Sequence, residues 1–260
     1  MVPVNVEKIE DLFKTITPGT TVSFIYETYS MSWELPLVLI KYHIENGNAA
    51  VISNYSRPVG HLFRDLKILG MNVKEVIKED RLFIIDVFGS RHRIIEGGKN
   101  IFYLDSVEPE TLNPKIWRIY EENIIPRIKD KWLLRVIYPL HGVVHFAGEE
   151  PTIKIMSQVI AKYSLNLPNS TMVLVFNRDT VSKNFTAWTV ELSDYVFLSK
   201  VFLGKGAIEE HLYFLKAPVP GFKPKEYRLI KTGKRGSGMF RIKKVGESSP
   251  ELRPPADEKR

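Results

Sequence analysis

Short apolar runs rich in β-branched residues alternate along the chain with longer stretches in which apolar residues recur every three to four positions. The short runs predict buried strands at 21–26, 48–53, 81–88, 132–138 and 171–176. The stretches between them are too long for hairpins and have the length and periodicity of helical crossover connections. This order predicts a parallel sheet with helices on its faces.

The longer stretches predict five helices. These are Val6 to Ile16, Trp33 to Glu45, Val59 to Gly70, Pro109 to Ile128 and Pro151 to Tyr163. A glycine ends the second and third of them, as is common at helix termini. We expect the fourth to be interrupted or kinked near Pro114 and Pro126, because proline cannot donate to the helical ladder.

After Asp194 the pattern changes to consecutive strands without helices between them. The segments "YVFLSKVF", "HLYFLKA", "YRLIK" and "MFRIKK" predict an antiparallel extension of the sheet. We therefore expect one α/β domain over residues 1–245, with a mostly parallel sheet, flanking helices and an antiparallel C-terminal extension. Residues 246–260 are polar and contain proline, which predicts a disordered tail.

Composition argues against several classes of protein. The chain has no cysteine, no basic-then-apolar N-terminal signal and no long uncharged apolar run, so disulfides, secretion and membrane insertion lack support. We expect a cytoplasmic protein. A single glutamine, Gln158, stands among many charged residues, which is typical of heat-adapted proteins.

Positive charge is concentrated near the C-terminus. The formal net charge is +7, yet residues 223–244 alone hold nine bases and one acid, Glu226. The rest of the chain is therefore close to neutral, and its basicity is a local feature that calls for a local explanation.

Several segments together resemble the KaiC-like branch of the RecA-like ATPases. The similarity is carried in order and spacing by "GTTVSFIY", "LPLVLIKYHIENGNAAVIS", "HLFRDLKILGMNV", "RLFIID" and "VELSDYVFLSK", and it extends over roughly Val4 to Lys244. The resemblance implies a RecA-like fold, and the chain looks like one of the uncharacterised archaeal proteins of that wider group.

In that family the turn after the first core strand is the phosphate-binding loop, G-x-x-x-x-G-K-S/T. Here the same eight positions hold Tyr26, Glu27, Thr28, Tyr29, Ser30, Met31, Ser32 and Trp33. A Cβ at the two glycine positions blocks the conformations and the close approach that the loop needs. Without the lysine, and with Glu27 adding negative charge, we expect the site to disfavour a nucleotide.

Two further positions of the family pattern also differ. Ser56 and Arg57 stand where the resemblance places catalytic glutamates, and Tyr138 or Pro139 stands where it places the acid that holds magnesium. Phosphoryl transfer needs a phosphate cradle, a held metal and an oriented water. We therefore expect a protein that does not hydrolyse ATP, with no cofactor, metal or catalytic residue.

The aromatic side chains of this corner have two interpretations. Tyr26, Tyr29 and Trp33 offer flat surfaces that suit stacking on a base or contact with a partner. Alternatively, they fill the volume that a nucleotide would occupy, and this interpretation is favoured.

Other polar residues are expected to be structural. His141 and His145 have the spacing of a zinc pair on a helix, but we expect "HGVVH" to be strand or loop, where four residues span about 13 Å. Asp194 resembles a family aspartate that introduces a strand. We expect Asp179 and Glu191 to be solvated loop charges.

The basic segment resembles the C-terminal hairpin of the family, with its K-x-R-G-type turn. The candidate interaction surface consists of Lys231, Lys234, Arg235, Arg241, Lys243 and Lys244. In active relatives basic residues of this turn reach a neighbouring subunit's nucleotide. Here the turn either pairs with acids of a neighbour, such as Glu27 or Glu34, or binds a nucleic-acid backbone, or is a solvated hairpin.

These observations predict a non-hydrolytic protein that acts as a binding, assembly or regulatory module. A protein partner or self-association is the expected interaction, and no membrane is involved. One alternative is a nucleic-acid-binding protein that uses the basic hairpin. The other is an ATP-binding protein with an atypical loop.

Overall fold

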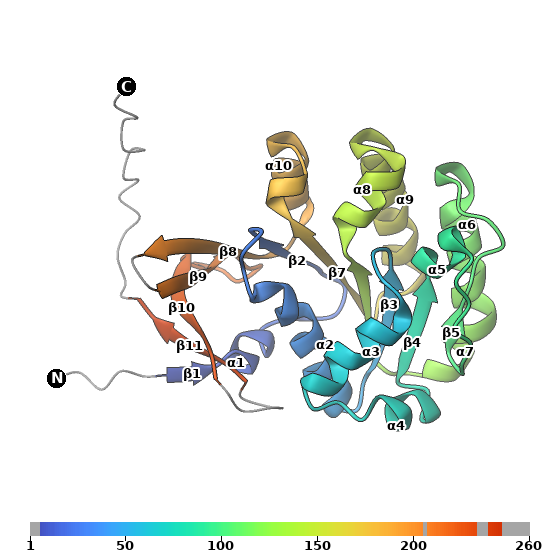
Figure 1. Cartoon of the computed structure of the whole chain (residues 1–260), viewed down its shortest axis with the longest axis horizontal. Coiled ribbons are helices and arrows are strands. Elements are labelled where there is room, and N and C mark those ends of the chain that lie inside the picture. The colour runs from blue at the N-terminus through green and yellow to red at the C-terminus, as the bar shows by residue number, and fades with distance from the viewer. Residues whose placement is uncertain (1–5, 205–206, 233–238, 246–260) are drawn as a thin grey trace.

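The computed structural model describes residues 6–204, 207–232 and 239–245, and within them eleven strands form one sheet (Figure 1). In chain order these strands are β1 Val6–Lys8, β2 Thr21–Tyr26, β3 Ala49–Asn54, β4 Leu82–Asp86, β5 Ile101–Phe102, β6 Leu133–Tyr138, β7 Ser170–Asn177, β8 Tyr195–Gly204, β9 Ala207–Lys216, β10 Lys225–Lys231 and β11 Phe240–Lys244.

Helices connect most of the strands in the first three quarters of the chain. They are α1 Glu10–Phe13, α2 Leu35–Glu45, α3 Val59–Ile68, α4 Val73–Lys78, α5 Val87–His92, α6 Pro109–Ile119, α7 Ile125–Ile128, α8 Leu140–Ala147, α9 Glu149–Asn166 and α10 Lys183–Leu192. The short 3₁₀ helices η1 Ser32–Glu34 and η3 Arg178–Thr180 follow β2 and β7, and the π-helical turn η2 Tyr120–Ile124 joins α6 to α7.

The strand order across the sheet is β1-β11-β10-β9-β8-β2-β7-β6-β3-β4-β5. From β8 to β5 every neighbouring pair is parallel, and from β8 to β1 every pair is antiparallel. The predicted fold class, a mostly parallel sheet with an antiparallel C-terminal extension, is confirmed.

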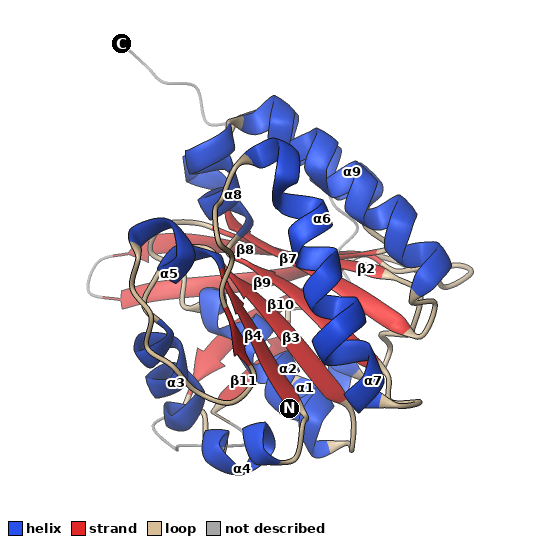
Figure 2. Ribbon diagram, turned by 90° about the vertical axis from the view of Figure 1, so that its right-hand side faces the viewer, coloured by secondary structure: helices blue, strands red, loops and turns tan. Residues whose placement is uncertain are grey.

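Helices cover both faces of the parallel strands (Figure 2). One apolar core lies between the sheet and α1 to α4, and the other lies between the sheet and α5 to α10. The strands between them are buried on both faces, which explains their nearly continuous apolar sequences. The first core continues beneath the antiparallel extension, whose inward side chains include Leu212, Phe214 and Leu229.

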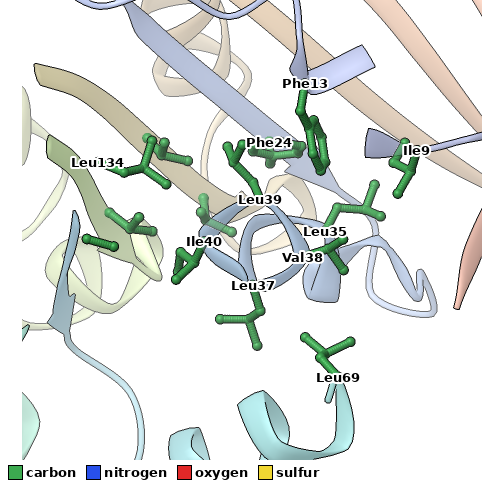
Figure 3. Close-up of a cluster of buried hydrophobic side chains, with 14 of the residues drawn as sticks. Ile9, Phe13, Phe24, Leu35, Leu37, Val38, Leu39, Ile40, Leu69 and Leu134 are labelled. Atoms are coloured by element: carbon green, nitrogen blue, oxygen red, sulfur yellow. The ribbon is translucent and has the colours of Figure 1, made fainter. Parts of the chain in front are cut away.

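Helix α2 is buried on more than one side. Leu35 and Leu39 point toward Phe13 and Phe24, whereas Leu37 points toward Leu69, beyond the end of α3 (Figure 3). Each such apolar side chain contributes about 1.5–3 kcal/mol when it is fully buried. The packing of α2 therefore fixes the end of the loop that joins it to β2.

The predicted helix over Val6 to Ile16 is wrong in its first part. Val6–Lys8 is strand β1, which pairs antiparallel with β11, and only Glu10–Phe13 is helical. The partner strand lies at the other end of the chain, so local periodicity gave no sign of this pairing. Three short elements, α4, α5 and β5, and the longer α10 were also not predicted.

The interruption of the long helix 109–128 is confirmed, but its cause differs from the expectation. Pro114 lies inside α6, while the helix changes to π geometry at Tyr120–Ile124 before Pro126 enters the first turn of α7. The expectation for "HGVVH" is wrong, because these residues lie in helix α8. Its N-cap Pro139 follows β6 directly, so the helix begins without a loop that the sequence would reveal.

No helix among the described residues has both the length and the apolar character needed to cross a bilayer. The predicted tail, residues 246–260, lies outside the described residues.

Candidate functional site

The carboxyl ends of five parallel strands meet at one edge of the sheet. The last residues of β2 and β7, Tyr26 and Asn177, lie opposite each other, and Asn54 at the end of β3 lies opposite both Tyr138 and Asp86. Open α/β sheets bind their ligands outside this edge. The loop from Tyr26 to Trp33 begins here, so the fold places the predicted corner where a ligand site is expected.

The corner loop is a compact turn. The Ser30 N–H donates to the Glu27 carbonyl at 3.0 Å, and the Glu34 N–H donates to the Met31 carbonyl at 3.2 Å. The loop then passes through η1 into the buried helix α2. Its backbone is thus held at both ends, by the sheet and by the packing of α2.

A carboxylate from the antiparallel extension lies inside this turn. Glu210 of β9 is only 1% exposed and accepts hydrogen bonds from the Met31 N–H at 2.8 Å and the Ser32 N–H at 3.2 Å. The hydroxyls of Ser30 and Ser199 donate to the same carboxylate. An internal anion therefore accepts backbone donors of the loop, in the way that a phosphate does in a phosphate-binding turn.

Two other acids hold the outer part of the loop. Glu27 accepts from the Val201 N–H at 2.9 Å. Asp179 accepts from both the backbone N–H and the hydroxyl of Thr28 at 2.9 Å, and the Asn177 side chain donates to the same hydroxyl. Asp179 is exposed, as expected for a solvated charge, and it also ties the corner to the turn after β7.

Arg57 lies between two aromatic rings at the same edge. Its guanidinium carbon is 5.2 Å from the Trp33 ring centroid and 5.5 Å from that of Tyr138. It donates to the buried carboxylate of Asp65 at 2.5 Å and to the Tyr138 hydroxyl at 3.1 Å. Arg57 therefore contacts both Trp33 and Tyr138.

The aromatic residues of the corner differ in exposure. Tyr26 and Trp33 pack against the apolar core, whereas Tyr29 is 72% exposed. Burial raises the pKa of Tyr26 to about 12, although nearby Arg57 acts in the opposite direction. Burial also raises the pKa of Tyr138. Both phenols are therefore neutral near pH 7, and neither is a ready nucleophile or base.

Asp86 is a buried acid at this edge that the sequence reasoning did not single out. Its Oδ1 accepts from the Asn54 side chain at 2.7 Å and from the Gly89 N–H at 3.0 Å, at the start of α5. Burial is the main cause that raises its pKa. The sequence signal that could have identified Asp86 is its place as an acid at the end of a buried strand. Its hydrogen bond from the Gly89 N–H makes it the N-cap of α5.

His141 and His145 are one helical turn apart on α8, with ring centroids 5.5 Å from each other. The Nδ1 of His141 accepts from the Asn177 N–H at 3.2 Å. Burial, with a smaller contribution from His145, lowers the pKa of His141 to about 4. Across the described part of the chain, no group of three or more His, Asp or Glu side chains is arranged to hold a metal.

The basic residues that the sequence grouped together are divided between the two faces of the extension. Lys231 points inward and forms an ion pair with Glu34 of the same chain. Arg241 and Lys243 alternate with the buried Phe240 and Ile242 and so point outward. Lys244 is on the inward side, opposite Tyr227. Lys234 and Arg235 lie outside the described residues.

Asp194 has the structural position that was expected. Its carboxylate accepts from the Thr21 N–H at 2.8 Å and so joins the start of β2 to the segment before β8. Glu191, near the end of α10, is on a helix rather than in a loop, and its carbonyl accepts from the Lys216 side chain at 3.0 Å.

Comparison with solved structures identifies the fold of the chain. No protein-family model and no curated protein matches the sequence. Among solved structures, the chain is similar to the uncharacterised protein PH0321 from Pyrococcus horikoshii, crystallised in complex with an unknown peptide. The TM-score is 0.74 and the identity 19%, over 92% of this chain and 98% of that one.

A second solved structure is the KaiC-like protein PH0186 from Pyrococcus horikoshii OT3. Its TM-score with this chain is 0.64 at 15% identity, over 83% of this chain and 87% of that one. At this level of identity the likeness shows the fold. The chain therefore has the KaiC-like α/β fold of the RecA group, as its sequence resemblance implied.

Proposed function

We propose that this protein does not hydrolyse nucleotides and acts as a binding or assembly module for a protein partner or a second copy of itself. The fold supplies the usual ligand-binding edge, and the side chains there contact one another. The observation that carries the proposal is the position of Glu210 within the corner loop.

Glu210 competes directly with a phosphate for the corner. A phosphate bound in the loop would need the Met31 and Ser32 N–H groups that the carboxylate already accepts. It would also have to approach a buried negative charge, which disfavours a second anion. The loop has no lysine to offset that repulsion.

The other parts of a hydrolytic site are also engaged elsewhere. Arg57 is paired with Asp65 and packs on Trp33 and Tyr138. The Tyr138 hydroxyl stands near the position of a metal-holding acid, and its raised pKa leaves it protonated near pH 7. These contacts favour a structural role of the corner, in which it stabilises the folded protein, over a role in binding a metal and a phosphate.

Exposed apolar side chains support a protein contact at the same end of the molecule. Leu203 and Ile208 lie opposite each other in the β8–β9 hairpin and are 68% and 60% exposed. The hydrogen bond from Val201 to Glu27 joins this hairpin to the corner, where Tyr29 is also exposed. The complex of PH0321 with an unknown peptide adds support, since that protein shares the fold.

Calorimetry with ATP and magnesium tests the first half of the proposal. We expect no binding heat at millimolar ATP, because Glu210 accepts the loop donors. Micromolar binding that is lost on Tyr29→Ala or Ser32→Ala would overturn the proposal in favour of an atypical nucleotide site.

The mass of the same protein in solution tests the second half. We expect a mass above that of one chain, and the double variant Leu203→Lys with Ile208→Lys should lower it. A monomer at all concentrations would exclude self-association and direct the search to another protein.

A further inference from the structure

Helices cover one face of the antiparallel extension only near the start of β8, where Val196 belongs to the second apolar core and Leu198 and Leu215 pack against it. Strands β9, β10 and β11 curve around α1, and their opposite side is open in Figure 1. We call this side of β8 to β11 the outer face. Inward residues of the same strands, such as Leu212, Leu229 and Ile242, belong to the first apolar core.

Strand pairing places basic side chains in rows across the outer face. Lys200 lies opposite His211, His211 opposite Arg228, and Arg228 opposite Lys243, so one row crosses four strands. In a second row Arg241 lies opposite Lys8 of β1. Like charges directly opposite each other destabilise a sheet, so these rows cost folding free energy.

Acids on this face pair with the two middle members of the first row, His211 and Arg228, but not with the other bases. Glu209 pairs with Arg228 at 2.7 Å, and Glu226 accepts from the Tyr213 hydroxyl at 3.0 Å and contacts His211 at 2.6 Å. Among the described residues, no carboxylate lies within 4.0 Å of the charged groups of Lys200, Arg241 or Lys243.

Aromatic rings lie beside one of these bases, Lys200. Phe202 is 48% exposed, and its ring centroid is 5.1 Å from that of His211. The His211 centroid is 6.5 Å from that of Tyr213, and the two rings are nearly parallel. The Lys200 ammonium is 5.7 Å from the centre of the Tyr213 ring. The outer face thus combines a short line of rings with the cation of Lys200, while Glu209 and Glu226 lie opposite Phe202 and Tyr213, and Arg241 and Lys243 lie farther out on β11.

We propose that the outer face binds single-stranded nucleic acid. Exposed rings on a four-stranded sheet can stack two or three unpaired bases, while neighbouring cations contact the phosphates. Phe202, His211 and Tyr213 are the stacking residues, and Lys200, Arg241 and Lys243 are the phosphate contacts. The inference goes beyond the proposed function, because it adds a nucleic-acid ligand on a face that the proposed protein contact does not use.

The rings favour a single strand over the other polyanions that a basic surface attracts. In a duplex the bases are stacked on each other and unavailable to the rings. An acidic protein segment would use the cations but would gain little from the rings. A single strand uses both features, and its affinity should depend on salt because phosphate contacts release counterions.

Fluorescence anisotropy with labelled twelve-nucleotide oligo(dT) and oligo(U) tests the inference on the full chain. We expect binding with a slope of log K against log salt near −2, from about three phosphate contacts at 0.7 each. The duplex of matching length should bind at least tenfold more weakly. No binding of either single strand at 50 mM salt would overturn the inference.

Two pairs of variants separate a specific surface from net charge. The double variant Arg241→Glu with Lys243→Glu should weaken binding at least tenfold, whereas Lys67→Glu with Lys74→Glu, at exposed sites on α3 and α4, makes the same charge change and should not. Phe202→Ala should weaken binding about fivefold or more. Ile68→Ala, at an exposed apolar site on α3, is its control and should have no effect.

Equal losses from both charge variants would contradict the proposal and indicate non-specific attraction. The proposal would also be overturned if Phe202→Ala bound the oligonucleotide with unchanged affinity and polyglutamate displaced the labelled strand as effectively as unlabelled oligonucleotide does. That result would indicate an acidic protein partner. The titrations are repeated with ATP and magnesium. If the oligonucleotide binds only in the presence of ATP, the proposed function is contradicted. If the oligonucleotide binds under neither condition and calorimetry shows no ATP binding, only the outer-face inference is contradicted.

Discussion

The corner after β2 and the outer face of the extension are both rich in polar groups, but only the corner satisfies them within the chain. At the corner, Glu210 and Asp179 accept from the loop, and Arg57 pairs with Asp65. On the outer face, Arg241 and Lys243 point to solvent, and Lys200 lies beside the ring of Tyr213. The edge at which open α/β sheets bind ligands is thus held by hydrogen bonds within the chain, while a peripheral surface has unmatched charge.

This difference has energetic consequences that can be measured. Removing one partner from a satisfied buried network leaves the other groups without hydrogen bonds, which is costly. Changing an exposed, unmatched charge costs little stability and affects binding instead. Substitutions at the corner should therefore lower stability, and substitutions on the outer face should leave it nearly unchanged.

The largest expected effect is at Glu210. Glu210→Ala removes the acceptor that two backbone N–H groups and two hydroxyls share, and the Met31 N–H loses its only hydrogen-bond partner among the described residues. We expect it to lower the free energy of unfolding by about 3 kcal/mol. Its neighbour Glu209 is exposed and pairs with Arg228, so Glu209→Ala should cost less than about 1 kcal/mol. Urea unfolding of both variants measures the difference. Similar small losses in the two would show that the corner does not depend on this carboxylate.

A smaller loss is expected at Arg57. Arg57→Ala leaves the mostly buried Asp65 without its main partner, and the partial exposure of the arginine limits the expected loss to about 2 kcal/mol. Arg64 also approaches Asp65, at 3.7 Å, but it is largely exposed. Arg64→Ala should therefore change stability by less than about 0.5 kcal/mol. If thermal unfolding shows the same shift for both variants, the Arg57 contact is not a stabilising part of the corner.

The smallest expected effect is a pH dependence that comes from buried histidines. Burial lowers the pKa of His43 and of His141 to about 4, against an ordinary value near 6.5. As pH falls from 6.5 toward 4 the unfolded chain takes up protons that the folded chain excludes, so stability falls, and this loss ends below about pH 4.

For His141 we expect about 1 kcal/mol of stability to be lost between pH 6.5 and 5, after allowing for its partial exposure. His141→Asn retains an acceptor for the Asn177 N–H and should reduce the pH dependence. The exposed His61 is the control, and His61→Asn should leave the dependence unchanged. Urea unfolding at pH 7, 6 and 5 tests this, and parallel curves for His141→Asn and the wild type would refute it.

The sequence was most informative for the parallel half of the fold. Its strands are buried on both faces, so apolar runs such as Thr21–Tyr26 and Leu133–Tyr138 carry a strong local signal. The location of the corner followed from the order of these strands. Glu210 was missed because its partners are about 180 positions away in sequence. An inward acid in phase with Leu212 and Phe214 was the available signal.

The basic segment shows a similar limit. Its charge was evident, but composition alone treats all bases of 223–244 alike. The period of two in a strand separates Arg241 and Lys243 from Lys244, and cross-strand pairing then places Lys200 in the same row. The register between strands depends on the whole sheet, so the sequence could not supply that last step.

The pairing of β1 with β11 bears on how the protein is made. Val6 lies opposite Lys243, so β1 remains without its partner until β11, more than 200 residues later in the sequence, has left the ribosome. The parallel half has its own strands, helices and cores, and it can collapse earlier. Closing the extension is then the slow, non-local step of folding, because its contacts span the longest sequence separation. Until it is complete, the edge of β11 is open to pairing with other chains.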